Sequence, residues 1–298
     1  MGGISGERKI SFISGKACSA ALRKKGYKVK ELDAKGDFVN KLRKLKPKAV
    51  FNALHGRYGE DGYVQSILEM LKLPYTHSGV ASSFLAMDKE LSRVLFKKKG
   101  IKVPKYFLLK KENEKNLKKL LFKKKINFPI VIKPINEGSS LGVYICKNKN
   151  DFKKYYKKLK KKYERILVEQ YIPGKEIQAA VMDKKALGAI ELIPKRKFYD
   201  YKAKYSSKAQ TKHIMPASIN RKKYKEVLEI AKKAHKVLKC SGITRSDFRF
   251  FNNKFYLLET NTQPGMTKLS LVPEIANYCG INFETLVDWI IRDANCNR

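Results

Sequence analysis

Arg245-Ser246-Asp247 and, beyond an apolar run, Glu259-Thr260-Asn261-Thr262-Gln263-Pro264-Gly265-Met266 form the stretch of sequence that decides the fold. Asp247, Glu259 and Asn261 carry side-chain oxygens at the edges of predicted strands, beside the tight turn that begins at Gln263. Carboxylate and amide oxygens are the ligands that Mg²⁺ prefers, and such a set can hold Mg²⁺ against the phosphates of a nucleotide. The stretch therefore indicates ATP chemistry.

The stretch belongs to the last of three blocks, residues 169–298, which periodicity predicts to contain strands and a long helix. The strands are expected at 177–182, 185–191, 243–251 and 254–259, with the helix between Tyr224 and Leu238. Residues 194–216 show no clean period and are long for a connection. Because this segment contains several aromatic residues, we interpret it as a lid that orders over a ligand.

Residues 85–168 form the central block. A helix is expected from Lys89 to Lys99, and strands are expected at 106–109, 130–133 and 166–169. Between strands lies the turn Asn136-Glu137-Gly138-Ser139-Ser140-Leu141-Gly142. A turn rich in glycine and serine can fold over phosphates, although such turns are common.

Residues 1–84 form the N-terminal block and alternate helices with short apolar runs. A helical face runs from Ile10 to Ala21, a strand is predicted over Val29–Leu32, and further helices are predicted around Leu42 and Val64. This alternation favours a parallel sheet covered by helices. The whole chain is therefore assigned to the mixed α/β (α+β) class, with three domains at 1–84, 85–168 and 169–298.

Composition limits the possible classes of protein. The 298 residues are 43% hydrophobic, which is enough to bury the cores of about two or three domains. No run approaches the roughly 20 apolar residues of a membrane span, and the first residues lack the pattern of a secretion signal. We expect a cytoplasmic protein without a membrane partner. The five cysteines form no Cys-x-x-Cys pair, so neither a zinc site nor a redox dithiol is indicated.

The formal net charge is +39, from 66 basic and 27 acidic residues, which raises the question of nucleic-acid binding. Lysines occur along the whole chain, as in 97–99, 123–125 and 157–162, on predicted outer helix faces, and arginines are few. This distribution favours solvated helix faces. We therefore expect no nucleic-acid partner, and a smaller role for the charge in attracting anionic ATP.

Seven short motifs follow one another along the chain: Gly2-Gly3-x-Ser5-x-Glu7-Arg8, His55-Gly56-Arg57-x-Gly59-Glu60-Asp61-Gly62, Met87-Asp88-Lys89, Lys133-Pro134-x-x-Glu137-Gly138-Ser139-Ser140-x-Gly142, Phe198-Tyr199-Asp200-Tyr201-x-Ala203-Lys204-Tyr205, Arg245-x-Asp247, and Glu259-x-Asn261-Thr262-x-Pro264-Gly265-Met266-Thr267. Together they resemble the D-alanine–D-alanine ligases, members of the ATP-grasp family. In that family ATP lies between two small sheets and its γ-phosphate passes to the carboxylate of a first D-alanine. The amine of a second D-alanine then displaces phosphate.

The resemblance implies a metal site and a triphosphate site. Asp247, Glu259 and Asn261 match the residues that bridge two Mg²⁺ (or Mn²⁺) ions to the β- and γ-phosphates. Lys89 and Lys133 match the lysines that contact the α- and β-phosphates. Positioning and charge neutralisation are what phosphoryl transfer requires of a protein.

The resemblance also implies how the rest of ATP is bound. The segment Glu169-Gln170-Tyr171-Ile172 matches the adenine site, with Gln170 in place of the lysine often found there, and Glu176 matches the residue for the ribose hydroxyls. The remaining implied ATP contacts come from the glycine- and serine-rich turn and from the lid: Glu137, Ser139, Ser140 and Lys204.

On the amino-acid side, Glu7 matches the residue that receives the ammonium of the first D-alanine, and His55 lies near its carboxylate. Arg245 and the Gly265 N–H match an oxyanion hole for the tetrahedral intermediate. The other implied positions are the hydrogen-bond partners of the first substrate, Ser139 and Tyr205, and the residues that receive the carboxylate of the second, Ser270 and Leu271.

The lid bears on the product. In the family, a tyrosine in the Ala-Lys-Tyr motif accompanies peptide formation, whereas the relatives that accept D-lactate have a different lid. Tyr205 therefore implies D-alanyl-D-alanine, a precursor of peptidoglycan. Lid closure would exclude the water that hydrolyses an acyl phosphate.

The N-terminus departs from the family pattern, because most relatives have a short apolar strand ahead of the turn that here is Gly2-Gly3. Either the N-terminal sheet lacks its first strand or the start of the sequence is misplaced. A parallel strand buried on both faces is costly to omit, which favours a misplaced start. Without that strand, Glu7 would sit on a loop that lacks its usual anchor.

Several alternatives stay open from the sequence. A ligase of another amino-acid pair would share the nucleotide site and differ in the substrate pocket. A catalytically inactive ATP-grasp scaffold would require that the missing strand ruins the site. A basic nucleic-acid-binding protein is supported by charge alone. We also expect a homodimer, the commonest assembly of soluble enzymes and usual among the relatives.

Overall fold

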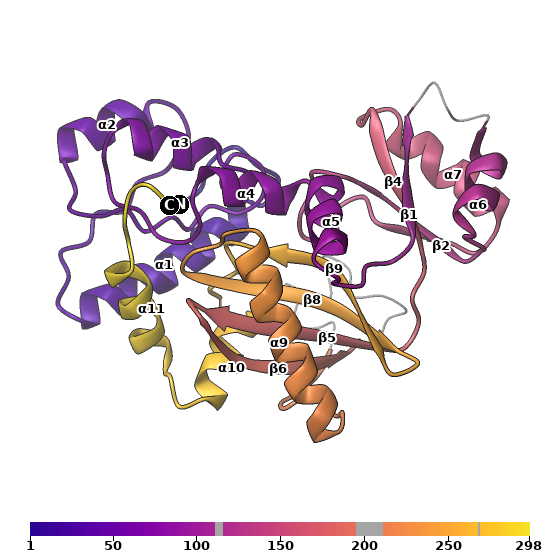
Figure 1. Cartoon of the computed structure of the whole chain (residues 1–298). Coiled ribbons are helices and arrows are strands. Elements are labelled where there is room, and N and C mark those ends of the chain that lie inside the picture. Colours follow the sequence, from indigo (N-terminus) through magenta and orange to yellow (C-terminus); the bar gives the residue numbers. More distant parts are fainter. Residues whose placement is uncertain (111–115, 195–210, 268) are drawn as a thin grey trace.

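The computed structural model describes residues 1–110, 116–194, 211–267 and 269–298, and Figure 1 shows an N-terminal helical region beside two separate sheets. The N-terminal region contains α1 (Arg8–Lys24), α2 (Phe38–Leu45), α3 (Tyr63–Met70) and α4 (Val80–Met87). The predicted helices of this region are confirmed. Together with α11 (Phe283–Arg292), which packs against α1, they build the left-hand part of the molecule in Figure 1.

The strand predicted over Val29–Leu32 is wrong, because this segment is extended but joins no ladder. Its neighbour is the single residue Met1, whose amino group donates to Leu32 O at 2.9 Å and whose carbonyl accepts from Ala34 N at 2.9 Å. Among the described residues, the expected parallel sheet of this region is reduced to one isolated parallel bridge, Val50 to Tyr75. A strand requires paired backbone groups over several residues. Val29–Leu32 has no such partner, and a cavity of about 760 Å³ separates it from residues 49–54, which line the same cavity.

A four-stranded antiparallel sheet lies at the right of Figure 1, in the strand order β1-β4-β2-β3. Its strands are β1 (Tyr106–Lys110), β2 (Ile130–Pro134), β3 (Tyr144–Cys146) and β4 (Arg165–Gln170). Alternate residues such as Ile132 and Val168 pack beneath α6 (Leu117–Lys124) and α7 (Lys149–Leu159). The intervening residues Val131, Lys133 and Glu169 line a cavity on the other face. The period of two thus gives this sheet one core face and one binding face.

The second sheet has five antiparallel strands in the order β7-β6-β5-β8-β9. They are β5 (Lys175–Met182), β6 (Lys185–Ile193), β7 (Lys212–Ile214), β8 (Ile243–Phe251) and β9 (Lys254–Asn261). The predicted strands of this block are confirmed, and β7 is an addition within the predicted lid segment.

Both faces of the five-stranded sheet are covered. Ala179 and Val181 belong to the core beneath α9 (Arg221–Val237), whereas Ala180 and Ile190 belong to the core shared with α1, α10 (Leu271–Tyr278) and α11. Small alternating side chains allow helices to approach the sheet closely from each side. This sheet is therefore packed on both faces and lies at the centre of the molecule (Figure 1).

Helix α5 (Lys89–Lys98) connects the N-terminal region to the two sheets. Its N-cap is Asp88, whose side chain accepts hydrogen bonds from the backbone of Glu90 and Leu91 at 2.9 and 3.0 Å. These bonds satisfy free N–H groups of the first turn. The cap fixes the position of Lys89, the first residue of the helix.

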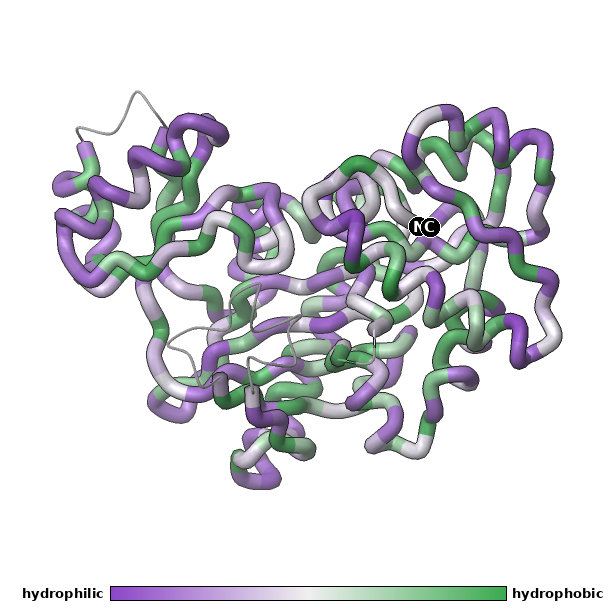
Figure 2. Tube along the Cα trace, turned by 180° about the vertical axis from the view of Figure 1, so that it is seen from behind, coloured by the Kyte–Doolittle hydropathy of each residue, from purple (hydrophilic) through white to green (hydrophobic). Residues whose placement is uncertain are grey.

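Hydropathy follows this architecture. Figure 2 shows hydrophobic residues concentrated along the strands and hydrophilic residues along the peripheral helices. The buried core forms separate clusters around each sheet and in the N-terminal region. In the part of the chain that the structure describes, no helix has the length and apolar character needed to cross a membrane.

Candidate active site

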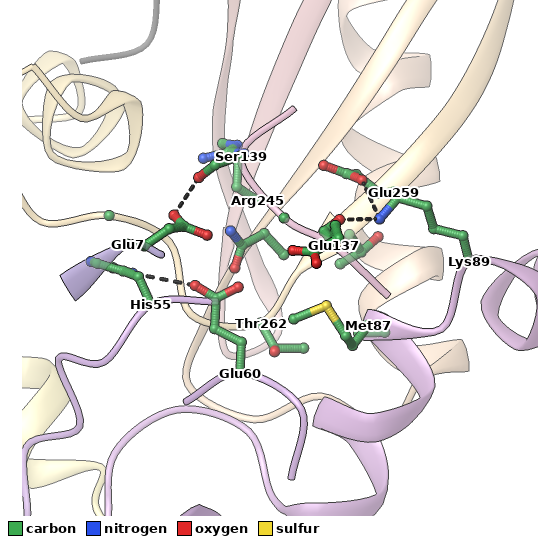
Figure 3. Close-up of a pocket in the computed structure, with 15 residues that line it drawn as sticks. Glu7, His55, Glu60, Met87, Lys89, Glu137, Ser139, Arg245, Glu259 and Thr262 are labelled. Carbon is green, nitrogen blue, oxygen red and sulfur yellow. Dashed lines mark hydrogen bonds and ion pairs between the residues drawn. The ribbon is translucent and has the colours of Figure 1, made fainter. Parts of the chain in front are cut away.

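Two adjoining cavities occupy the space where the sheets and the N-terminal region meet. The larger, about 480 Å³, lies between the two sheets. We name both cavities after the ligands that the sequence motifs predict for them, and this one is the nucleotide cavity. The smaller, about 60 Å³, lies next to the N-terminal region, and we call it the amino-acid cavity (Figure 3). Lys89, Glu137 and Glu259 line both. A ligand in one cavity would therefore share these side chains with a ligand in the other.

The nucleotide cavity is bounded by side chains from both sheets. The predicted triphosphate, adenine and ribose residues all line it, namely Lys89, Lys133, Glu137, Ser140, Glu169, Gln170, Tyr171, Ile172 and Glu176. Ser139, also predicted for ATP, lines the amino-acid cavity instead. The sequence reasoning missed Arg249, which donates to Ile172 O at 3.0 Å and lies 3.2 Å from the Glu176 carboxylate. Arg249 thus fixes the turn that leads from the predicted adenine segment to Glu176.

A buried charged cluster forms one wall of the nucleotide cavity. Lys133 Nζ lies 2.8 Å from Glu169 Oε1, and the other carboxylate oxygen of Glu169 is paired with Arg93 from α5. Burial lowers the pKa of Lys133, an effect that the negative charge of Glu169 opposes. Burial alone would raise the pKa of Glu169, but the attraction of Arg93 and Lys133 outweighs it and the pKa is lowered. Glu169 is therefore ionised between two cations.

The predicted metal ligands lie at neighbouring positions of two paired strands. Asp247 of β8 is the register partner of Glu259 of β9, and Arg245 is the partner of Asn261. Cross-strand partners present their side chains on the same face, so the two carboxylates can act together. The described residues contain no cluster of three or more His, Cys, Asp and Glu side chains that could hold a metal. The predicted set has two carboxylates and one amide, a hard oxygen set of the kind that suits Mg²⁺.

Both carboxylates are paired with cations in this structure. Arg245 Nε and Nη2 donate to the two oxygens of Asp247 at 2.7 and 3.1 Å, and Lys89 Nζ lies 3.3 Å from Glu259 Oε2. Asn261 Oδ1 accepts from the Gln263 backbone at 2.7 Å. The predicted metal ligand Glu259 is thus paired with the predicted phosphate ligand Lys89, and the predicted metal ligand Asp247 with the predicted oxyanion-hole residue Arg245.

The amino-acid cavity brings together residues from distant parts of the chain (Figure 3). Glu7, at the start of α1, is buried and accepts a hydrogen bond from Ser139 Oγ. His55 Nδ1 lies 3.2 Å from Glu60 Oε1, and His55 Nε2 lies 2.9 Å from Ser14 Oγ. Glu60 was not among the predicted site residues, although it stands five residues after His55 in the same motif. Its carboxylate determines how the imidazole is oriented.

The second predicted carboxylate site lies beside this cavity, at the start of α10. A Cβ built on Gly265 would lie only 2.9 Å from Ser270 Oγ, so glycine allows the turn and the helix to approach each other closely. Leu271 buries its side chain in the core, so a contact with a ligand would have to come from its backbone. The N-terminus of a helix favours an anion. Neither Ser270 nor Leu271 lines the two cavities as they stand.

Two predicted residues, Lys204 and Tyr205, lie outside the described residues, as does most of the predicted lid at 194–216. The described remainder of that segment includes β7, where His213 Nδ1 lies 2.7 Å from a carboxylate oxygen of Glu274 in α10. This contact joins the edge of the sheet to the helix that begins after Ser270.

Known proteins resemble this chain in sequence and in fold. Family models described as the D-ala D-ala ligase N-terminus and C-terminus match residues 33–78 and 95–292. A D-alanine–D-alanine ligase of Pelagibacter ubique is 54% identical over 298 residues, which are 100% of this chain and 97% of the relative. A crystal structure of the D-alanine–D-alanine ligase of Bacillus anthracis superposes with a TM-score of 0.88 at 33% identity, covering 98% of this chain and 95% of the other. The complex of that ligase with ATP gives a TM-score of 0.86 at 30% identity, covering 98% and 94%.

Two sheets facing each other across a cavity lined by lysines and carboxylates define an ATP-grasp enzyme. The matches to both family models and to the relatives go further. The chain belongs to the D-alanine–D-alanine ligase family.

Proposed function

We propose that this enzyme joins two D-alanines to form D-alanyl-D-alanine for peptidoglycan, with ATP as the source of energy. The observation that carries the proposal is the adjacency of the two cavities, which share Lys89, Glu137 and Glu259. A γ-phosphate at that boundary would stand next to the carboxylate of an amino acid in the smaller cavity. Phosphoryl transfer needs this positioning more than it needs a covalent contribution from the protein.

Lys89 and Lys133 neutralise the phosphates in this proposal. Both are buried in the wall of the nucleotide cavity, so their charges are poorly screened by water. Lys89 Nζ donates to Glu137 O at 2.6 Å, which ties the glycine- and serine-rich turn to α5. That bond would hold the turn over the phosphates. Lys204 would reach the γ-phosphate from the lid.

Asp247, Glu259 and Asn261 would hold two Mg²⁺ (or Mn²⁺) ions. The bound ions would supply positive charge to the β- and γ-phosphates. For this to happen, Asp247 and Glu259 must exchange Arg245 and Lys89 for the ions. The released cations are then available to the substrate, so metal and nucleotide are expected to bind together.

The first D-alanine would place its ammonium against Glu7 and its carboxylate toward His55. Glu7 is 3% exposed, so its attraction for an ammonium is strong once water is excluded. Ser139, which donates to Glu7, would couple the occupied pocket to the turn over ATP. Tyr205 of the lid would close the same pocket.

The second D-alanine would attack the acyl phosphate with its amine. Released from Asp247, Arg245 would stabilise the oxyanion of the tetrahedral intermediate together with the Gly265 N–H, a contribution of about 3 kcal/mol for one such donor. The carboxylate of this substrate would lie at the start of α10, near Ser270 and the backbone of Leu271. Phosphate would then leave as the peptide bond forms.

The second candidate is an ATP-dependent ligase of a different amino-acid pair. It shares the nucleotide cavity, and the pocket around Glu7 and His55 is what would differ. We further propose that the enzyme works in the cytoplasm, where ATP is available, and as a homodimer.

Release of phosphate from ATP by the purified chain tests the proposal. We expect release with D-alanine and Mg²⁺, with one D-alanyl-D-alanine formed for each phosphate, and no ester product when D-lactate is added. A panel of D- and L-amino acids serves as the comparison. If an L-amino acid or a different D-amino acid supported faster release than D-alanine, the second candidate would replace the first.

A further inference from the structure

Arg93 is the largest fully buried side chain of the described residues, and the roles proposed above do not use it. It projects from α5 with none of its side chain exposed to solvent. Its Nη2 atom is paired with the Glu169 carboxylate and lies 3.4 Å from Leu258 O. The guanidinium lies 5.1 Å from the ring centre of Tyr106. A buried cation is costly unless it is paired, so a plain apolar residue would be the cheaper core side chain here.

The charges around Arg93 suggest why a cation is kept. The Glu169 carboxylate has one negative charge and forms two ion pairs, one oxygen with Arg93 and the other with Lys133. The three side chains together carry a net charge of +1, and Lys133 is the cation of the three that lines the nucleotide cavity. Without Arg93, Glu169 and Lys133 would form a neutral pair. Lys133 would then have little remaining charge for a phosphate.

Geometry supports the same conclusion. Arg93 stands one helical turn after Lys89, so both project from the same face of α5 toward the cavity wall. Val131 of β2 is the register partner of Glu169 of β4, and Lys133 follows two residues later on the same face of the sheet. The pair between Arg93 and Glu169 thus fixes α5 to the binding face of the four-stranded sheet, with the two proposed phosphate lysines on either side of it.

We propose that Arg93 is a positioning residue for ATP: it binds one oxygen of Glu169 and thereby leaves Lys133 directed at the phosphates. This inference rests on the proposed function, because it takes Lys133 to be a phosphate ligand. Arg93 itself does not touch ATP. Its effect passes entirely through the charge and the orientation of Glu169.

The test is the affinity for MgATP, measured by calorimetry on four variants of the full chain. Arg93→Met removes the cation, and Arg93→Met with Glu169→Gln removes cation and carboxylate together. Arg93→Lys is the conservative variant. The matched control is Arg165→Met, because Arg165 pairs with Glu90 and also joins β4 to α5, but outside both cavities.

We expect Arg93→Met to weaken MgATP binding by about 10-fold or more, since it lets Glu169 neutralise Lys133. The double variant should recover most of this loss, because Lys133 is again uncompensated and the adenine contact implied for residue 169 comes from its backbone, which the substitution keeps. Arg93→Lys should lie between Arg93→Met and the unmodified chain. Arg165→Met should bind as the unmodified chain does, and the KM for D-alanine should change little in any variant. A purely structural role for Arg93 predicts instead that the double variant is at least as weak as Arg93→Met, which would overturn the inference.

A further variant separates this inference from the function on which it rests. Lys133→Met should abolish most MgATP binding. If it bound MgATP normally, the proposed role of Lys133 would be wrong. If Lys133→Met lost binding while Arg93→Met kept it, the proposed function would stand and the role of Arg93 would fall. Melting temperatures show which variants are folded, and should Arg93→Met not fold, the comparison of Arg93→Lys with the double variant decides.

Discussion

At the scale of single residues, burial changes the titration of one histidine. His77 is buried behind Phe51, and burial lowers the pKa of its imidazole to about 3, with smaller contributions from Arg298 and His55. In the unfolded chain its pKa is near the usual histidine value of 6.5. Between these two values the unfolded state binds a proton that the folded state does not. The contribution of His77 to the free energy of unfolding is therefore fully present above about pH 6.5 and is lost as the pH falls toward 3.

Replacing His77 with asparagine should reduce this pH dependence. Asparagine does not titrate, and it tolerates the positive φ of 69° at this position better than most residues. The free energy of unfolding, measured with urea from pH 7.5 to 4, should fall less steeply in the variant than in the parent. Equal slopes would mean that His77 is not the titrating group.

Glu7→Gln should weaken the first amino-acid site specifically. The variant keeps the shape and the contact with Ser139 but removes the charge that faces an ammonium. We expect the KM for D-alanine to rise by about 10-fold to 100-fold, because the loss of a buried charged partner costs a few kcal/mol. The affinity for MgATP serves as the control and should stay within about twofold. A loss of MgATP affinity without a change in the KM for D-alanine would contradict this assignment.

At the scale of secondary structure, caps place functional side chains. Asp88→Ala should destabilise α5 by about 1 kcal/mol through the loss of its N-cap, and it should also raise the KM for ATP because Lys89 begins the helix. Asn148→Ala is the matched control, since Asn148 caps α7 in the same way, away from both cavities. Thermal unfolding should show a lower melting temperature for both variants, whereas the KM for ATP should rise only in Asp88→Ala. Equal effects of the two variants on the KM for ATP would sink the idea.

Most helices and strands follow from local pattern, and the exceptions have a physical reason. The alternation of Ile130, Ile132, Ile166 and Val168 predicts strands with one apolar face, and the structure confirms it. Val29–Leu32 reads Val-Lys-Glu-Leu, a weaker pattern with two charged residues between its apolar ends, and it forms no ladder. Strand formation depends on a neighbour's backbone as well as on the segment's own residues, and the sequence of the segment contains no information about its neighbour.

The candidate site was predictable where its residues belong to local motifs. Lys89, Lys133, Glu137 and Glu259 stand in recognisable motifs, and all four line the nucleotide cavity. Arg93 was missed because its partner Glu169 is distant in sequence, and no local signal marks an arginine in an amphipathic helix as buried. Only the packing of α5 against the sheet reveals the pair.

At the scale of the whole molecule, the charge of +39 should affect the rate of nucleotide capture. A cationic surface attracts anionic ATP over distances that salt reduces to roughly 8 Å at physiological ionic strength. We therefore expect the association rate constant for ATP, measured by stopped flow, to fall severalfold as salt rises from about 0.05 to 0.5 M. The KM for D-alanine, a zwitterion, should change much less. An association rate that does not depend on salt would show that the surface lysines play no part in capture.

The distant parts of the molecule are joined through polar side chains as well as cores. Asn52 Nδ2 donates to Gln263 Oε1 at 2.7 Å, and Gln263 also donates to Leu54 O. These bonds connect the N-terminal region to the turn that carries Gly265. Gln263 occupied a variable slot of its motif in the sequence, and its role as a connector depends on a contact that spans most of the chain.

The packing of α11 on α1 has a consequence for biosynthesis. Lys24 pairs with Glu284, Tyr27 donates to Asp288, and Tyr75 forms a bridge with Asn295. A ribosome releases the first helix long before the last one, so the face of α1 that α11 covers in the folded chain waits uncovered until translation ends. During that interval, the exposed apolar face of the first helix is open to aggregation and to chaperone binding.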